Sequence, residues 1–119
     1  MYEQYLNRTN DGMIEQEDTL YLLSEISNSP HLTQRELSSK LNISLGKTNY
    51  LMQQLIKKGV LKASSFSHNP GRLKKISYML TKKGLQEKID LTLFFLKVKE
   101  DEYNKIKFYW EQISNPQKQ

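Results

Sequence analysis

A mainly α-helical protein with one small β-hairpin, an α+β fold, is the class that this 119-residue sequence predicts. Apolar residues recur at helical spacing in the first half of the chain. The period changes after Gly59 and becomes two from Leu73 to Leu80, beyond Pro70-Gly71, and a helical pattern then runs from Thr81 to about Ser114. A chain of this length forms one domain by default and buries a modest core.

The first predicted helix begins near Ile14 and follows residues 1–12, which we expect to form a flexible arm. The face that we expect to pack inward carries Leu20, Leu23, Ile26 and Ser27, widened by Leu22. Proline disfavours helical geometry in the residue before it, so Asn28-Ser29-Pro30 ends this helix.

Two short helices joined by a tight turn are predicted between Thr33 and Gly59. Thr33 and Glu36 can form a capping box, in which each side chain bonds the backbone amide of the other residue. Asn42 tolerates the left-handed conformation of a tight turn. Ser44 then caps the third helix, and Gly59 ends it. This is the pattern of a helix-turn-helix, whose last helix enters the major groove of DNA.

A β-hairpin is predicted after Gly59. Residues 60–66 and 73–80 are short segments with β-branched and aromatic residues, and His68-Asn69-Pro70-Gly71 between them is a strong turn signal. Three helices followed by a hairpin make a winged helix-turn-helix domain over residues 13–80, with the turn as the wing.

One long helix is predicted over residues 81–114, with residues 115–119 as a disordered tail. About 33 helical residues span roughly 50 Å, whereas a compact domain of this size is roughly 35 Å across. The domain therefore cannot cover this helix. Its apolar residues approximate a heptad seam, which we expect to form a homodimer interface through Ile89, Leu93, Leu96, Tyr103, Ile106 and Trp110. The alternative is that the helix folds back over the chain's own three helices.

Basic charge is concentrated in one part of the chain. Residues 31–83 hold eleven basic residues and one acid, residues 1–30 hold one basic residue and six acids, and residues 84–119 hold six of each. The basic block coincides with the predicted helix-turn-helix and wing, which favours double-stranded DNA as the partner. A solvated lysine-rich surface is the alternative.

The outward face of the third helix is polar, basic and aromatic, because Thr48, Leu51, Met52 and Leu55 fall on the inward side. Amides read adenine edges, cations take guanine or phosphate, and a guanidinium at the wing tip can enter the minor groove. The predicted DNA contacts are Gln34, Arg35, Ser44, Gly46, Lys47, Asn49, Tyr50, Gln53, Lys57, Arg72 and Lys74. Asn49, Gln53 and Arg72 could instead be ordinary solvent-facing side chains.

A resemblance to the MarR-type winged-helix transcriptional regulators is carried by TQRELSSKLNISLGKTNYLMQQLIKKGVLKA, the wing and the following YMLTKKG. The step Leu80-Thr81-Lys82-Lys83-Gly84 recurs in that family, and ISLGKTNY is similar to its small exopolysaccharide-associated subgroup. The resemblance covers about residues 14–110 and implies a homodimer on palindromic operators, possible control of exopolysaccharide genes and, in many members, a small-molecule effector. The chain departs from the family in having no cysteine and in lacking the full set of dimerisation helices.

Catalysis, metal binding and membrane insertion find little support in the residues. His31 and His68 lie in predicted turns, and there is neither metal-ligand spacing nor a phosphate-cradling glycine loop, so we expect no enzyme and no cofactor. Without an apolar run for a signal peptide or a membrane span, we expect a cytoplasmic protein. Two other functions stay open: a winged helix used for protein contacts, and a DNA-binding replication or partition protein.

Overall fold

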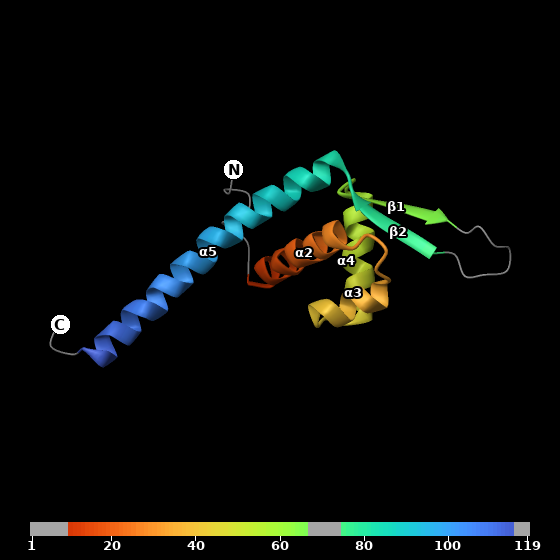
Figure 1. Ribbon diagram of the computed structural model, residues 1–119. Helices are drawn as coiled ribbons and strands as arrows, with labels where there is room; N and C mark the ends of the chain where they lie inside the picture. Colours follow the sequence, from red (N-terminus) through yellow and green to blue (C-terminus); the bar gives the residue numbers. More distant parts are fainter. Residues whose placement is uncertain (1–9, 67–74, 116–119) are drawn as a thin grey trace.

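The computed structural model describes residues 10–66 and 75–115. In chain order its elements are α2 (Asn10–Asn28), α3 (Gln34–Leu41), α4 (Leu45–Lys57), β1 (Leu61–Phe66), β2 (Lys75–Leu80) and α5 (Lys82–Ser114). The first three helices and the hairpin form a head, from which α5 extends as a stalk (Figure 1). The molecule measures 74 × 28 × 22 Å. The predicted fold class, a winged helix-turn-helix with a long C-terminal helix, is confirmed.

The ends of the two short helices are fixed by the predicted capping residues. The Thr33 Oγ1 atom accepts a hydrogen bond from the Glu36 amide at 3.1 Å, and the Glu36 carboxylate accepts one from the Thr33 amide at 3.3 Å. Asn42 is left-handed with φ 55°, as is Gly59 with φ 77°. Ser44 Oγ accepts from the amide of Lys47 at 3.0 Å. Local sequence signals therefore define the helix-turn-helix.

One hydrophobic core fills the head and extends onto the first half of α5. The Phe94 and Phe95 rings of α5 pack edge to face, with their centroids 5.0 Å apart. Every helix and both strands contribute buried side chains, which are Leu22, Leu23, Ile26, Leu37, Leu51, Met52, Leu55, Leu61, Tyr78, Leu91, Phe94 and Phe95, joined by Val60 between α4 and β1. The first half of α5 is therefore part of the domain rather than a free extension.

Helix α2 differs from the prediction in its start and in its buried face. It begins at Asn10, before the predicted start at Ile14, and residues 1–9 of the predicted arm lie outside the described residues. Leu22 is completely buried, whereas Ser27 is exposed and its hydroxyl donates to the Leu23 carbonyl at 2.9 Å. Periodicity alone could not predict which face of α2 is buried. Leu22 and Leu23 are adjacent in sequence, and each is compatible with a different apolar face of the helix.

The hairpin is antiparallel, with Leu61 opposite Leu80 and Phe66 opposite Lys75. Its strands lie within the two predicted segments. The predicted wing tip, including Pro70-Gly71, Arg72 and Lys74, lies outside the described residues. The Tyr78 amide donates to the Pro30 carbonyl at 3.2 Å, which attaches β2 to the loop between α2 and α3.

The start of α5 is fastened to the end of α4. The Val60 carbonyl accepts a hydrogen bond from the Thr81 amide at 3.1 Å, and Thr81 Oγ1 donates to the Gly59 carbonyl. A Cβ atom on Gly84 would collide with the carbonyl oxygen of Val60, so only glycine allows this approach. Helix α4, the hairpin and the stalk therefore meet at one junction.

Candidate nucleic-acid interface

Helix α4 has one buried face and one exposed face, as predicted. The buried side chains are Thr48, Leu51, Met52 and Leu55. The exposed residues include Gly46, Asn49, Tyr50, Gln53 and Lys57. Tyr50 is 53% exposed, and no acidic residue occurs from Gly46 to Gly59. The exposed face thus offers amides, a phenol and a cation, which is chemistry suited to the edges of bases and to phosphate.

The first turn of α4 leaves room for a close approach of its backbone. Gly46 is exposed, and a Cβ atom added there would meet no atom within 4 Å. Ser44, which caps the helix, is exposed beside it. Because a helix N-terminus carries partial positive charge, this turn suits contact with a phosphate.

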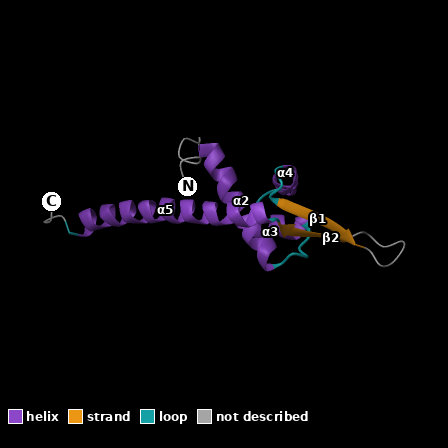
Figure 2. Cartoon of the chain, turned by 90° about the horizontal axis from the view of Figure 1, so that it is seen from above, coloured by secondary structure: helices purple, strands orange, loops and turns teal. Residues whose placement is uncertain are grey.

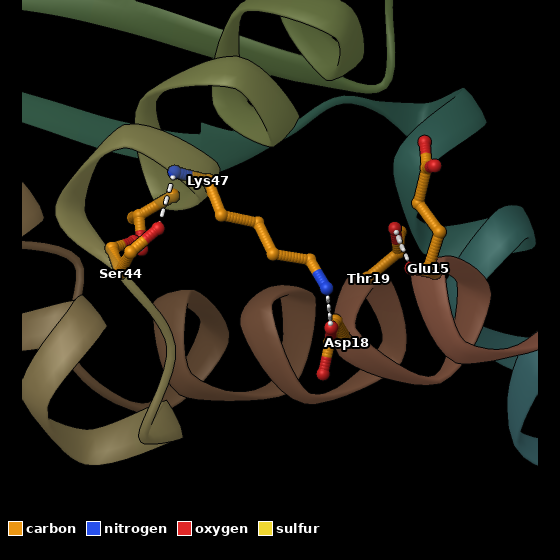
Figure 3. Close-up of polar contacts among 6 residues, drawn as sticks. Glu15, Asp18, Thr19, Ser44 and Lys47 are labelled. Atoms are coloured by element: carbon orange, nitrogen blue, oxygen red, sulfur yellow. Dashed lines mark hydrogen bonds and ion pairs between the residues drawn. The ribbon is translucent and has the colours of Figure 1, made fainter. Parts of the chain in front are cut away.

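Lys47 is directed toward α2 rather than along that exposed face (Figure 3). Its Nζ atom lies 2.7 Å from Oδ2 of Asp18, a residue of α2 whose side chain is 18% exposed. The DNA contact expected of Lys47 stays a prediction. Lys47 would have to leave Asp18 to contact DNA.

Four side chains form a continuous chain of hydrogen bonds, which we call the amide relay. Gln53 Nε2 donates to Asn49 Oδ1 at 3.3 Å, and Asn49 Nδ2 donates to Gln34 Oε1 at 3.1 Å. Gln34 Nε2 then donates to the Tyr78 hydroxyl at 3.3 Å. The relay joins α4, α3 and β2, and it places three predicted contacts, Gln34, Asn49 and Gln53, in one network.

The other predicted contacts lie around this network. Arg35 is exposed in the first turn of α3, beside the half-buried Gln34. Arg72 and Lys74 lie outside the described residues. Sequence reasoning missed Asp18 and the hydroxyl role of Tyr78. In the sequence, Tyr78 indicated only core packing of the second strand. Asp18 was one of six acids in an acidic segment and had no feature that set it apart.

A second ionic contact ties α2 to the stalk. The Glu17 carboxylate lies 3.1 Å from Lys99 Nζ of α5 and accepts a hydrogen bond from the Tyr21 hydroxyl at 3.0 Å. The hydrogen bond to Glu17 raises the pKa of Lys99 and the pKa of Tyr21 above their ordinary values. Glu17 and Asp18, adjacent on α2, thus bind α5 and α4 respectively.

The apolar residues along one side of α5 are exposed, although the opposite side packs into the core. Most of the predicted interface is between 51% and 65% exposed, namely Ile89, Leu96, Tyr103, Ile106 and Trp110, whereas Leu93 is half-buried. Ile113, which continues the predicted heptad seam, is 73% exposed, and Leu85, which was not predicted, is 54% exposed. The second half of α5 stands clear of the head in two perpendicular views (Figures 1 and 2).

Neither a metal site nor a membrane span was found in the described residues. Residues 10–66 and 75–115 contain no group of three or more histidine, aspartate or glutamate side chains that could hold a metal ion. None of the described helices is both long enough and apolar enough to cross a membrane.

The fold and the exposed face of α4 define a winged helix-turn-helix protein, and residues 20–62 match the family model described as winged helix-turn-helix DNA-binding. No curated protein matches the chain in sequence. Solved structures of similar fold include PadR-like and MarR-family transcriptional regulators, in agreement with the resemblance seen in the sequence.

Three of these structures illustrate the likeness. A PadR-like transcriptional regulator from Bacillus cereus is 22% identical, with a TM-score of 0.61 over 81% of this chain and 93% of that one. S. aureus MepR bound to ethidium bromide is 18% identical, with a TM-score of 0.57 over 97% and 82%. A MarR family transcription regulator is 15% identical, with a TM-score of 0.55 over 87% and 76%. At these identities the likeness shows the shared fold.

Proposed function

We propose that this chain is a transcriptional regulator that binds double-stranded DNA sequence-specifically as a homodimer. The observation that carries the proposal is the exposed face of α4, which presents amides, a phenol and a lysine and has no acidic residue. The opposite face of the helix is packed in the core. The match to a DNA-binding family model supports the same function. Arg35 and the wing residues Arg72 and Lys74 would add phosphate or minor-groove contacts.

Binding to duplex DNA at several salt concentrations tests this proposal. Release of counterions from phosphates makes the logarithm of affinity fall with the logarithm of salt, by several units of slope for a dimer. Arg72→Ala should weaken binding to all sequences, while Gln53→Ala should change the sequence preference. Absence of binding at low salt would refute the regulator.

The dimer would form along the exposed side of α5. Seven apolar side chains form this seam. Ile89, Leu96, Tyr103 and Trp110 follow one another at steps of seven, and Leu85, Ile106 and Ile113 lie at the alternate position of the same heptad, where Thr92 and Lys99 interrupt the apolar series. All seven side chains are at least half exposed. In a second copy of the chain, the same seam supplies a self-complementary apolar surface, as a two-fold interface requires.

A parallel orientation of the two α5 helices fits the proposed DNA function best. Parallel stalks place both heads at one end, where two α4 helices can reach half-sites about 34–36 Å apart. Antiparallel stalks would put the heads at opposite ends of helices roughly 50 Å long. Glu102 and Lys107 flank the seam, and in a parallel pair they can form salt bridges between the copies.

Single cysteines can test this interface, because the chain has no cysteine of its own. In a parallel dimer, Leu96→Cys and Ile113→Cys should each form a disulfide with the same residue of the second copy. Asp101→Cys, on the opposite side of α5, is the matched control. Sedimentation of the unmodified chain as a clean monomer at micromolar concentration would refute the dimer, while cross-links near only one point of the seam would indicate an antiparallel pair.

A dimer with two-fold symmetry would bind a palindromic operator. Such a regulator would act in the cytoplasm, where the DNA is. Selection of bound sites from random duplexes would identify the operator, and the half-site spacing would report the dimer geometry. The resemblance to the small exopolysaccharide-associated regulators makes genes of exopolysaccharide synthesis the first place to look for that operator. A winged helix used only for protein contacts would enrich no sequence, and a replication protein would select sites at an origin.

A small-molecule effector is a further part of the proposal, supported by a cavity of about 300 Å³ between α2, the end of α4 and the start of α5. Gln16 Oε1 is buried at this cavity and, among the described residues, accepts no hydrogen bond. MepR, which has a similar fold, was solved with ethidium bromide bound. Ethidium, which carries amino groups, should raise the melting temperature of the unmodified chain more than that of Gln16→Leu. An equal shift of both proteins, or no shift, would refute binding in this cavity.

A further inference from the structure

The buried end of the amide relay is a fixed point. The Tyr78 side chain is 5% exposed, and the amide of Tyr78 is held by the Pro30 carbonyl at 3.2 Å. Because the ring packs in the hydrophobic core, its hydroxyl is placed at the base of the relay. Gln34 turns its nitrogen toward this hydroxyl, and its carbonyl oxygen consequently faces α4.

The orientation of Gln34 sets the orientation of the next amide. Gln34 Oε1 accepts only a donor, so Asn49 presents Nδ2 to it and turns Oδ1 toward Gln53. Asn49 Oδ1 in turn accepts from Nε2 of Gln53. Each amide therefore donates toward the buried end and accepts from the exposed end. Both ends of Asn49 are engaged, which makes it a positioning residue rather than a reader of bases.

The relay ends at Gln53, which is exposed on α4. One N–H of Gln53 is used by Asn49, whereas its Oε1 atom accepts no hydrogen bond from any residue that the structure describes. Gln53 therefore presents a free acceptor beside a second N–H donor. In the major groove, adenine offers the complementary pair, an N6 donor and the N7 acceptor.

We propose that Tyr78, Gln34 and Asn49 position the amide of Gln53 to read an adenine. This inference rests on the proposed function, because it concerns how the exposed face of α4 would select a base. An unsupported glutamine samples several rotamers and both amide orientations, and ordering it on binding costs conformational entropy. The relay holds the Gln53 amide against Asn49 in advance and so reduces that cost.

Removal of one hydroxyl group tests the proposal. Tyr78→Phe keeps the buried ring and deletes only the anchor of the relay, and Tyr21→Phe removes a phenol hydroxyl that bonds Glu17 instead. Sites would be selected from random duplexes with the unmodified chain, Tyr78→Phe, Tyr21→Phe and Gln53→Ala. Melting temperatures of all four proteins would confirm that each is folded.

We expect one adenine in the selected half-site to lose its preference in Gln53→Ala, by roughly tenfold or more, as for loss of a bidentate contact. Tyr78→Phe should weaken preference at that same position by about threefold or more, and Tyr21→Phe should leave it unchanged. Replacing this adenine with 7-deazaadenine should weaken binding by the unmodified chain and Tyr21→Phe more than by Tyr78→Phe.

Three results would refute, one each, the proposed function, the positioning of Gln53 and the readout of adenine. If the unmodified chain selects no sequence, the proposed function fails. If it selects a sequence and Tyr78→Phe keeps the full preference that Gln53→Ala loses, the relay does not position Gln53. If the position that depends on Gln53 prefers a base other than adenine, the inferred readout is wrong.

Discussion

Asp18 of α2 holds Lys47 of α4 through an ion pair of 2.7 Å. The pair is largely shielded on the acidic side, since the Asp18 side chain is 18% exposed. An acid of α2 thus neutralises a cation in the first turn of α4. The basic surface that would face DNA is smaller than the sequence charge suggests.

Asp18→Asn should therefore increase non-specific DNA affinity. The substitution removes a negative charge and releases Lys47 for a phosphate, so the slope of log affinity against log salt should steepen by about one unit. The free energy of unfolding should fall by about 1 kcal/mol or less, because the pair is partly exposed. Salt-dependent titration and thermal melting measure the two effects.

Glu25→Gln is the matched control for this change, because Glu25 also lies on α2 but pairs with Lys40 of α3 at 3.8 Å. It should leave the salt slope unchanged. A loss of DNA affinity in Asp18→Asn would instead mean that the pair holds α4 in its binding position.

Gly46→Ala should separate stability from DNA binding. No atom lies within 4 Å of the added Cβ, and alanine favours a helix over glycine by about 1 kcal/mol, so the melting temperature should rise or stay level. If the first turn of α4 contacts DNA as proposed, DNA affinity should fall, because the methyl group would occupy the open space between this backbone and the duplex. Unchanged affinity would show that the first turn of α4 stays away from the duplex.

Gly84→Ala should destabilise the junction of α4, the hairpin and α5. Its Cβ would collide with the Val60 carbonyl oxygen, a backbone atom that can yield only by moving the chain. Overpacking of this kind costs about 1–3 kcal/mol. Urea unfolding of Gly84→Ala beside Gly46→Ala measures the difference, and equal stability of the two variants would contradict the close approach.

The contact between α2 and α5 should weaken at alkaline pH. Hydrogen bonding to Glu17 raises the folded-state pKa of Lys99 above its ordinary 10.5 and that of Tyr21 above 10.0. Stabilisation from such groups is complete below the unfolded values and is lost as the pH rises through the folded values. Melting curves from about pH 8 to pH 12 should fall more steeply for the unmodified chain than for Glu17→Gln.

Glu25→Gln is the control for this pH dependence, because Glu25 of α2 pairs with Lys40 of α3 and not with Lys99 or Tyr21. Its melting profile should follow that of the unmodified chain. If Glu17→Gln also follows that profile, Glu17 does not stabilise the folded state through Lys99 and Tyr21.

The helix boundaries of the helix-turn-helix were predictable from the sequence, because the residues that set them act locally. Thr33 and Glu36 cap one helix, Ser44 caps the next, and Gly59 ends it, each within a few residues of the group it satisfies. The buried face of α4 followed from spacing alone, since Thr48, Leu51, Met52 and Leu55 share one side of any helix.

The contacts between elements were not predictable in the same way. Tyr78 and Gln34 are 44 residues apart, and only the packed fold brings the phenol to the amide. Asp18 and Lys47 meet because α2 crosses the start of α4, which no local pattern encodes. On α5, the heptad included Leu93, which lies half-buried, and omitted Leu85, because spacing alone does not say which stripe the head covers.

The junction at Gly84 joins the base of α5 to the end of α4. The Val60 carbonyl accepts hydrogen bonds from the amide and the hydroxyl of Thr81, and Phe94 and Phe95 hold the first half of α5 in the same core as α4. The part of α5 beyond Lys99 is an arm of roughly 22 Å, whose end moves by about 2 Å for a tilt of about 5°. A partner that binds Trp110 and Ile113 would therefore apply force to a helix whose other end is built into the core around α4.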